Sequence, residues 1–254
     1  MMPAAEILIG QEISLSVPDN PGHPWINQGA LHSPLGEPAF LASLPGPLPT
    51  SRNSGPDYCA SLPRKQEIIG ALLQEHYPST RTQDLVLVHS RWGKPHLLLN
   101  GAPGPGVSFS WCAGAWWAAV GAGGSWIGLD AASPREFNGA YPLHQVFSDG
   151  EWQAATFLTG GYREEAAALL WSVKEAVVKA RGCGYHFCAP RQVEVEYAGN
   201  GEYGSCWRGR LAASGPDPAP PGAPEVLPVA AIRLEQVWLA VAWMQLAPSQ
   251  APAG

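Results

Sequence analysis

The stretch Trp171-Ser-Val-Lys174-Glu175-Ala-Val-Val-Lys179 is the part of the chain that best defines its fold. It belongs to a longer run in which apolar residues recur at the i, i+3, i+4, i+7 spacing of a helix packed on a core. This apolar stripe consists of Ala166, Leu169, Leu170, Val173, Ala176, Val177 and Ala180. We predict a helix from about Tyr162 to Arg181, ended by Gly182 and Gly184.

Three charged residues, Lys174, Glu175 and Lys179, fall off the apolar stripe. Glu175 and Lys179 are four residues apart, so they can form an ordinary ion pair on a solvated helix face. A carboxylate between two cations also suits a site that holds a divalent metal beside an anionic phosphate. Spacing alone favours the ion pair, whereas the rest of the chain favours the metal and phosphate site.

Composition limits the classes of protein to which the chain can belong. With 254 residues, the chain can form one large domain or two modest ones around a hydrophobic core. Only 14% of the residues are charged and the formal net charge is −6, which argues against the broad basic surface of a nucleic-acid-binding protein. An anionic ligand must therefore be bound by a few local cations.

Five cysteines are scattered along the chain without a CxxC pair, so the paired spacing of a zinc site is missing. We expect reduced thiols in a cytoplasmic protein. The first residues, MMPAAEILIGQEIS, lack a basic leader and reach Glu6 at once. We therefore do not expect a secretory signal.

The segment 97–129 contains no Asp, Glu, Lys or Arg and is long enough to span a bilayer. Pro103, Pro105 and many glycines interrupt it, however, and two strand-like runs flank a glycine-rich turn. We therefore predict a buried β-hairpin, with strands at 115–120 and 126–130, instead of a membrane span.

The remaining pattern predicts two similar halves. In the first half, the predicted elements are short strands at 7–9 and 13–17, a helix at 63–77 with Pro63 in its first turn, and a strand at 85–89. In the second half, strands are predicted at 193–197, 206–213 and 237–244 after the long helix. Residues 215–224 form a Pro-rich loop, and 247–254 a disordered tail.

The predicted fold class is α+β, with a pseudo-twofold arrangement of two halves, 1–125 and 126–246. Each half is expected to be an antiparallel sheet packed on a long helix. The second half carries the helix that contains Lys174, Glu175 and Lys179.

Two acidic residues that are far apart in the sequence are candidates for one site. Asp130 ends the apolar run Trp126-Ile-Gly-Leu, where an Asp either emerges from the core or simply turns the chain. Together with Glu175 it would give a hard cation two oxygen ligands, and Mg²⁺ commonly uses one or two carboxylates plus substrate phosphates. Ser148 and Glu151 have the spacing of a capping box, so Glu151 is either a helix cap or a residue behind the site.

These residues occur in a series of ordered motifs. The series is Gly93-Lys94-Pro95, a serine-containing strand, Ile127-Gly-Leu-Asp130, Phe147-Ser-x-x-Glu151, Trp171-x-x-Lys174-Glu175-Ala176-x-x-Lys179 and Gly182-x-Gly184. In order and spacing, over about residues 60–190, it resembles the 4′-phosphopantetheinyl transferases. The likeness is to the longer, monomeric kind that serves peptide and polyketide synthases.

The resemblance implies a pseudo-dimer of two α+β halves with coenzyme A and Mg²⁺ in the cleft between them. Asp130 and Glu175 would bind the metal, and both, together with Lys179, would be the catalytic residues. The residues implied to contact coenzyme A are Lys94, Ser110, Lys174, Lys179 and Arg64. The serine hydroxyl of an acyl or peptidyl carrier protein would attack the β-phosphate and expel 3′,5′-ADP, with Glu175 or a water on the metal helping to remove the proton.

Two motifs depart from the family pattern, and a third position has more than one candidate residue. The Asp-x-Glu of the metal strand is Asp130-Ala-Ala132 here, so one carboxylate is missing. We align the Ser-His-Ser of the preceding strand with Ser110-Trp111-Cys112, in which an indole replaces a histidine that contacts phosphate. The basic residue of the first helix is Arg64 or Lys65, and Arg91 is a further candidate.

The leading hypothesis is thus a cytoplasmic, monomeric enzyme that transfers phosphopantetheine to a carrier protein and binds neither nucleic acid nor membrane. Trp111 and Ala132 leave an alternative, a relative that has lost catalysis and binds coenzyme A or a carrier protein as an adaptor. An unrelated α+β protein would not bind coenzyme A at all.

Overall fold

The computed structural model describes most of the chain between Asn27 and Gln245. The described residues are 27–33, 38–45, 55–77, 85–90, 93–121, 125–139, 141–183, 185, 188–201, 204–211 and 224–245. The strands expected at 7–9 and 13–17, Arg91, residues 215–223 of the Pro-rich loop and the expected tail lie outside the described residues.

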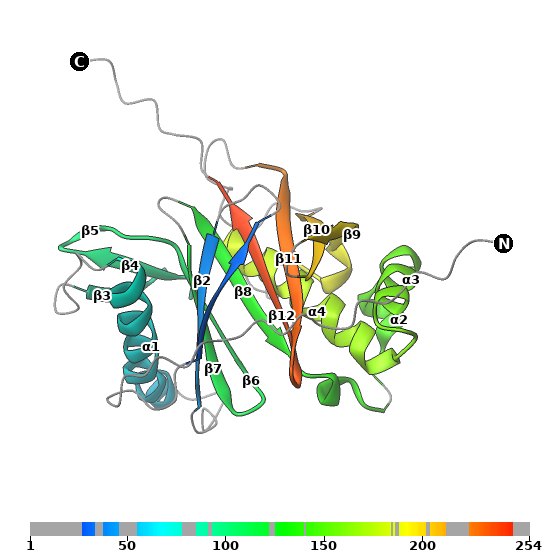
Figure 1. Cartoon of the computed structure of the whole chain (residues 1–254), viewed down its shortest axis with the longest axis horizontal. Helices are drawn as coiled ribbons and strands as arrows, with labels where there is room; N and C mark the ends of the chain where they lie inside the picture. Colours follow the sequence, from blue (N-terminus) through cyan, green and yellow to red (C-terminus); the bar gives the residue numbers. More distant parts are fainter. Residues whose placement is uncertain are drawn as a thin grey trace, which may run out of the picture.

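The second half of the chain forms a five-stranded antiparallel sheet with a long helix on one face (Figure 1). The strand order is β8-β12-β11-β10-β9. These strands are β8 (Trp126–Ala132), β9 (Val193–Gly201), β10 (Gly204–Leu211), β11 (Val226–Leu234) and β12 (Val237–Met244). Helix α4 (Arg163–Arg181) packs on β8 and β12. The shorter helices are η2 (Pro134–Phe137), α2 (Leu143–Val146), α3 (Asp149–Leu158) and η3 (Pro190–Gln192).

The first half contains a four-stranded sheet of order β1-β2-β7-β6 and a three-stranded sheet of order β3-β4-β5. The strands of the four-stranded sheet are β1 (Asn27–His32), β2 (Pro38–Pro45), β6 (Val107–Cys112) and β7 (Ala115–Gly121). Those of the smaller sheet are β3 (Leu85–His89), β4 (Pro95–Leu99) and β5 (Ala102–Pro103). Helix α1 (Gly55–His76) packs on β2 and β7. The fold is therefore a mixture of antiparallel sheets and few helices.

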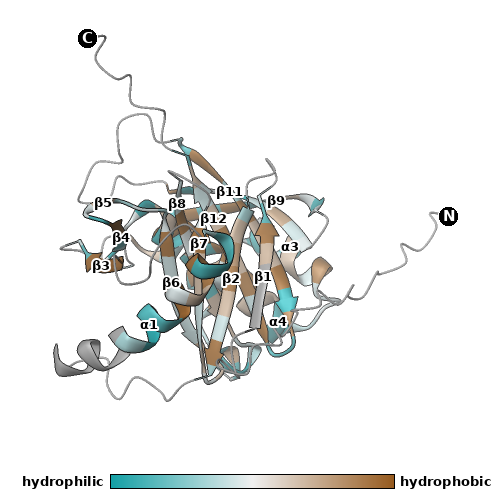
Figure 2. Ribbon diagram, turned by 60° about the vertical axis from the view of Figure 1, so that its left-hand side comes forward, coloured by the Kyte–Doolittle hydropathy of each residue, from teal (hydrophilic) through white to brown (hydrophobic). Residues whose placement is uncertain are grey.

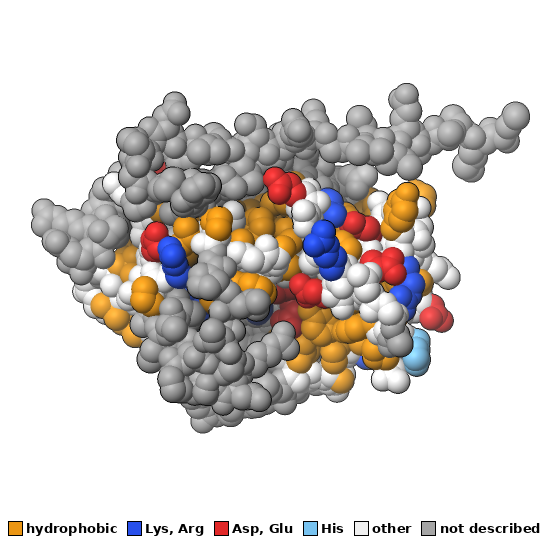
Figure 3. Space-filling model, turned by 90° about the horizontal axis from the view of Figure 1, so that it is seen from below, with side chains coloured by type: hydrophobic (Ala, Val, Ile, Leu, Met, Phe, Trp, Pro, Cys, Tyr) orange, Lys and Arg blue, Asp and Glu red, His pale blue; other side chains and the backbone are white. Residues whose placement is uncertain are grey.

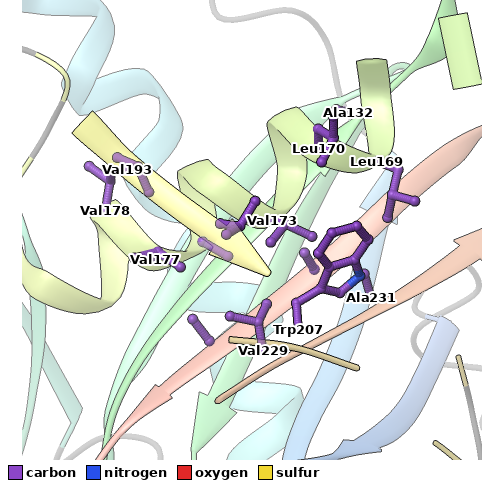
Figure 4. Close-up of a cluster of buried hydrophobic side chains, with 14 of the residues drawn as sticks. Ala132, Leu169, Leu170, Val173, Val177, Val178, Val193, Trp207, Val229 and Ala231 are labelled. Carbon is purple, nitrogen blue, oxygen red and sulfur yellow. The ribbon is translucent and has the colours of Figure 1, made fainter. Parts of the chain in front are cut away.

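Helix α4 confirms the prediction made from the apolar stripe. All seven residues of the stripe are completely buried. They pack against side chains of the sheet such as Trp207 and Val229 (Figure 4). The helix is capped by Gly182, whose φ of 77° places it in the left-handed region that favours glycine. The capping box of Ser148 and Glu151 at the start of α3 is also confirmed.

The hairpin predicted across residues 115–130 is wrong in its pairing, although both strands exist. Strand β7 pairs with β2 and β6, whereas β8 pairs with β12 in the other sheet. The outer edge of β8 is bonded by serine side chains of β6: the Ser108 hydroxyl accepts from Leu129 N at 2.8 Å and the Ser110 hydroxyl from Ala131 N at 3.2 Å. These bonds satisfy edge amides that a neighbouring strand would otherwise bind.

Other elements depart from the predictions because their formation depends on tertiary contacts. Strands β1 and β2 lie in the Pro- and Gly-rich first sixty residues, and β2 is held between β1 and β7. Strand β11 was missed because it contains Pro228, which disfavours a central strand. Helix α1 begins at Gly55, so Pro63 lies inside the helix rather than in its first turn.

The uncharged segment 97–129 forms strands of the two halves. Within the described part of the chain, no helix is long and apolar enough to cross a membrane. Hydrophobic residues are concentrated instead in the strands of the packed sheets (Figure 2).

Candidate active site

The site begins where β8 and α4 come into backbone contact. A Cβ at Gly128 would overlap the carbonyl oxygen of Ala176 and the amide nitrogen of Ala180, so only glycine permits this approach. Two residues further along β8, Asp130 points to the same face of the strand as Gly128. Asp130 lies within β8, which continues to Ala132 and does not end at Asp130 as expected, and the close approach brings its carboxylate against the last turns of α4.

Asp130 is 5% exposed and is bonded by residues from both halves of the chain. Lys179 Nζ of α4 lies 2.6 Å from Asp130 Oδ1 and also donates to the carbonyl oxygen of Phe109 at 3.3 Å. The Ser110 hydroxyl of β6 donates to the same Oδ1 at 2.8 Å. Both hydrogen bonds that Asp130 makes in the described part of the chain are thus on Oδ1. They fix the carboxylate and leave Oδ2 for another ligand.

Glu175 lies one turn before Lys179 on the same edge of α4 and is half-buried. Burial raises the pKa of its carboxyl group, Lys179 lowers it and Asp130 raises it, so that the pKa is about 7. Asp130 and Glu175 are therefore close enough to interact electrostatically, with Lys179 near both. Spacing had favoured an i,i+4 ion pair between Glu175 and Lys179 on a solvated helix face. In the structure, Lys179 forms an ion pair with Asp130 on β8.

A cleft of about 230 Å³ opens beside these residues and is lined by both halves of the chain. The first half contributes Lys65, His89 and Lys94, and α4 contributes Glu175 and Lys179. Burial and then Lys179 lower the pKa of Lys65; burial, Lys65 and His96 lower the pKa of His89. Such crowding of cations in a partly buried cleft favours an anionic ligand such as a phosphate.

The cations of the cleft contrast with the surface that Figure 3 shows. On the described part of that face, basic side chains lie among acidic and hydrophobic ones. That described part shows no broad basic patch.

Lys174 does not join the site. Its side chain is buried and its Nζ lies 2.9 Å from Glu151 Oε2. The same nitrogen donates to the carbonyl oxygens of Val146, Pro190 and Val193 at 3.1, 3.1 and 2.7 Å. The position of Lys174 off the apolar stripe had indicated exposure, but the structure makes it part of the core that joins α4 to α3 and β9.

The structure separates the two candidates for the basic residue of the first helix. Arg64 is exposed and pairs with Glu67 at 2.9 Å, whereas Lys65 lines the cleft. The sequence could have predicted this difference. Lys65 precedes the buried Ile68, Ile69 and Leu72 at the i+3, i+4, i+7 spacing, so it lies on the same face of the helix as they do.

The cleft face of β6 lies two residues earlier than expected. Ser108 and Phe109 line the cleft, whereas Ser110 lies behind it on Asp130 and Trp111 is not part of its lining. His89 and Cys183 also line the cleft and were not expected there, because nothing in their sequence context distinguishes them. Within the described residues, the structure thus brings Asp130, Glu175, Lys179, Ser110 and Lys94 together, and Lys174 and Arg64 lie apart from them.

The donor atoms present restrict what metal the site can bind. In the described part of the chain, no group of three or more His, Cys, Asp or Glu side chains is placed to hold a metal ion. Two carboxylates beside a cleft lined by lysines meet the needs of Mg²⁺, which keeps several waters and takes one or two carboxylates together with substrate phosphates. The residues therefore fit a magnesium ion that arrives with a phosphate ligand, and not a metal held by protein alone.

Part of the chain is similar to a known protein family. A sequence model of the 4′-phosphopantetheinyl transferase superfamily matches residues 127–212. The match runs from the second residue of β8 to beyond β10, and so includes Asp130, Glu175 and Lys179. It indicates a transferase of the phosphopantetheinyl class. No curated protein matches the chain significantly.

The raised pKa of Glu175 predicts a pH-dependent stability effect. Between about pH 4.5 and pH 7 the folded protein holds the Glu175 proton more tightly than the unfolded chain, so this contribution to stability is lost as the pH rises. Without divalent metal, Glu175→Gln is therefore expected to raise the free energy of unfolding by about 1–3 kcal/mol at pH 8, where the carboxylate is ionised, and to have no effect near pH 4.5.

Urea unfolding at both pH values, with EDTA present, measures this effect. The exposed Glu194→Gln serves as the matched control and is expected to change stability at neither pH. Equal stability of Glu175→Gln and the unmodified protein at pH 8 would show that the burial of this carboxylate has no energetic cost.

Proposed function

We propose that the protein transfers the 4′-phosphopantetheine group of coenzyme A to a serine of an acyl or peptidyl carrier protein, releasing 3′,5′-ADP. The observation that carries the proposal is the convergence of Asp130, Glu175 and Lys179 at a cation-lined cleft, inside the region that matches the superfamily. Lys65 and Lys179 at the cleft would provide positive charge for a diphosphate, and the two acids would provide ligands for its metal.

The order of the strands supports a pseudo-twofold relation between the halves, 1–125 and 126–246. In the first half, β2 leads into α1 and pairs with the last strand, β7, which also pairs with β6. In the second half, β8 leads into α4 and pairs with the last strand, β12, which also pairs with β11. Each half thus repeats one strand, a helix packed on it, and a closing antiparallel pair.

This relation bears on the assembly of the site. Because both halves of a single chain line the cleft, we propose that the protein acts as a monomer. The four described cysteines, Cys112, Cys183, Cys188 and Cys206, are free thiols, which supports our proposal of a cytoplasmic protein.

Asp130 Oδ2 and the Glu175 carboxylate would hold Mg²⁺, which would neutralise charge on the diphosphate and fix its orientation. Lys179 would contact the phosphate that is attacked. The carrier serine Oγ would form a bond to the β-phosphorus, and the bond from this phosphorus to the oxygen of the departing 3′,5′-ADP would break. The Glu175 carboxylate would accept the serine proton.

The position of β6 suggests which residue supplies the positive charge of the missing family histidine. We propose that the Ser-His-Ser motif corresponds to Ser108-Phe109-Ser110 rather than to 110–112, since Ser108 and Phe109 are the residues on the cleft wall. Phe109 cannot donate a hydrogen bond to phosphate. Its ring instead lies 5.5 Å from Lys65 Nζ, and Trp116 lies 5.0 Å from the same nitrogen. A lysine held by two aromatic rings would then supply the charge that the histidine supplies elsewhere.

One observation favours the second candidate, a coenzyme A- or carrier-binding adaptor without catalysis. Ala132, at the position of the missing family carboxylate, is completely buried and lies beside Leu170 (Figure 4). Apolar core residues therefore occupy the position at which a third acidic side chain would lie. In addition, Lys179 already neutralises Asp130.

Mass spectrometry of apo carrier proteins distinguishes the two candidates. The protein is incubated with coenzyme A, MgCl₂ and several acyl and peptidyl carrier proteins, and the mass of each carrier is measured. The enzyme is expected to add one phosphopantetheine to a carrier, and Asp130→Ala or Glu175→Ala to add none. Binding of a carrier without any gain in mass would instead support the adaptor, and failure to bind coenzyme A would exclude both.

A further inference from the structure

We infer that Lys94 is a positioning residue, which reaches from the first half of the chain to cap the C-terminal turn of α4 and so fixes Glu175 and Lys179 at the cleft. The positioning role in catalysis rests on the proposed function, whereas the capping contact itself is independent of it. The resemblance had assigned Lys94 to the nucleotide, but its contacts in the structure are with the helix.

The contacts of Lys94 are those of a helix cap. Its Nζ donates to the carbonyl oxygen of Ala180 at 2.6 Å and to that of Lys179 at 3.3 Å. The last carbonyl groups of a helix lack i+4 partners within the helix, and the Lys94 amine donates to two of them. The ammonium group further lies 4.0 Å from the centre of the Trp126 ring at the start of β8. One side chain thus contacts both elements that carry the candidate catalytic residues.

The local structure holds Lys94 in this position. It follows a tight turn in which Gly93, with φ 84°, donates its amide to the carbonyl oxygen of Ser90. The Lys94 amide is bonded to the Ser90 hydroxyl at 3.1 Å, and the Ser90 amide to the Lys94 carbonyl oxygen at 2.9 Å. On the helix side, Gly182 leaves room for the lysine stem, because a Cβ there would lie 2.8 Å from Lys94 Cδ. The turn before Lys94 therefore fixes its backbone, and the glycine at the C-cap of α4 leaves space for its side chain.

Lys65 provides the comparison that separates positioning from ligand binding. Both lysines line the same cleft and both contact aromatic rings, but Lys65 comes from α1, and Lys179 acts on it as a like charge that lowers its pKa. Loss of a lysine that binds phosphate weakens coenzyme A binding directly. Loss of a lysine that positions α4 loosens the helix end and slows the reaction while the ligand still binds.

The test compares Lys94→Met with Lys65→Met, because methionine keeps an apolar stem and removes only the ammonium group. In Lys94→Met, the amides at the end of α4, including Gly182 and Cys183, are expected to exchange with deuterium about tenfold faster. The kcat of transfer is expected to fall about tenfold with the KM for coenzyme A within about twofold, since small displacements of catalytic groups are costly. Lys65→Met is expected to raise this KM and leave the exchange unchanged.

A pair of glycine variants tests the same contact from the helix side. Gly182→Ala places a methyl group against Lys94, whereas Gly161→Ala has a similar φ of 89° but no atom within 4 Å of its Cβ. Both variants carry the strain of a left-handed alanine, so only the difference between them reports the contact with Lys94. Gly182→Ala is expected to accelerate exchange at the end of α4 more than Gly161→Ala does at its own turn, and the excess should vanish when Lys94→Met is also present.

The exchange and binding results decide the inference even if no carrier is modified. Unchanged exchange in Lys94→Met, or a loss of coenzyme A affinity as large as in Lys65→Met, would overturn it. Absence of transfer by the unmodified protein would count against the proposed function alone. Faster exchange at the end of α4 without a change in coenzyme A affinity would support the capping contact in either case.

Discussion

Asp130→Asn is expected to reduce phosphopantetheine transfer by at least about a thousandfold while leaving the protein folded. The asparagine keeps an oxygen that can accept the hydrogen bond from the Ser110 hydroxyl, so β8 stays in place. It removes the negative charge that would bind the metal and that now holds Lys179 Nζ at 2.6 Å. The measurement is the initial rate at which apo carrier protein gains phosphopantetheine, followed by mass spectrometry.

Ser110→Ala is the matched variant for this experiment. It removes the hydroxyl that donates to Asp130 Oδ1 and accepts from the Ala131 amide, but keeps the carboxylate and its ion pair. We expect it to slow the transfer by no more than about tenfold, because the charge that binds the metal is kept. If Asp130→Asn retained a tenth or more of the activity, the carboxylate would not be a metal ligand in the reaction.

Lys174→Met is expected to have the largest effect on stability. The substitution leaves the Glu151 carboxylate buried without its cation and three backbone carbonyl oxygens without their donor. Breaking a buried ion pair by removal of one partner typically costs about 3–5 kcal/mol in the free energy of unfolding. Urea unfolding followed by fluorescence of the tryptophans would measure this loss.

Two variants show whether the loss comes from the buried charge. Adding Glu151→Gln to Lys174→Met should recover part of the stability, because the remaining partner is then neutral and can still bond the Ser148 and Val195 amides. Arg210→Met, which breaks the exposed pair with Glu194, should cause no measurable loss. A loss for Lys174→Met as small as that for Arg210→Met would contradict a structural role for this lysine.

The sequence predicted those elements whose pattern is local. The apolar stripe of α4, the Ser148–Glu151 capping box and the glycine C-cap are set by residues within a few turns of one another, and all three are confirmed. The pairing of β7 and β8 could not be predicted in this way. Their partners, β2 and β12, are far away in the sequence, and hydroxyl groups of β6 satisfy the edge of β8.

The candidate site shows the same limit. Spacing and motif order identified Asp130, Glu175 and Lys179, which the structure brings together from β8 and α4. Spacing placed Lys174 off the core face, although its long side chain reaches a buried carboxylate that the helical pattern cannot reveal. The apolar spacing of α1 could have predicted that Lys65, and not Arg64, faces the cleft. The contact of Lys94 with α4 could not be predicted in this way, because it depends on how the two halves pack.

The central claim is that Asp130 and Glu175 together hold a magnesium ion against the diphosphate of coenzyme A. Calorimetry of coenzyme A binding, with MgCl₂ and with EDTA, tests it most directly. We expect the unmodified protein to bind about tenfold or more tightly with Mg²⁺ than with EDTA, and Asp130→Asn and Glu175→Gln each to lose this difference. An identical affinity with Mg²⁺ and with EDTA in the unmodified protein, or a metal effect that survives in both variants, would contradict the claim.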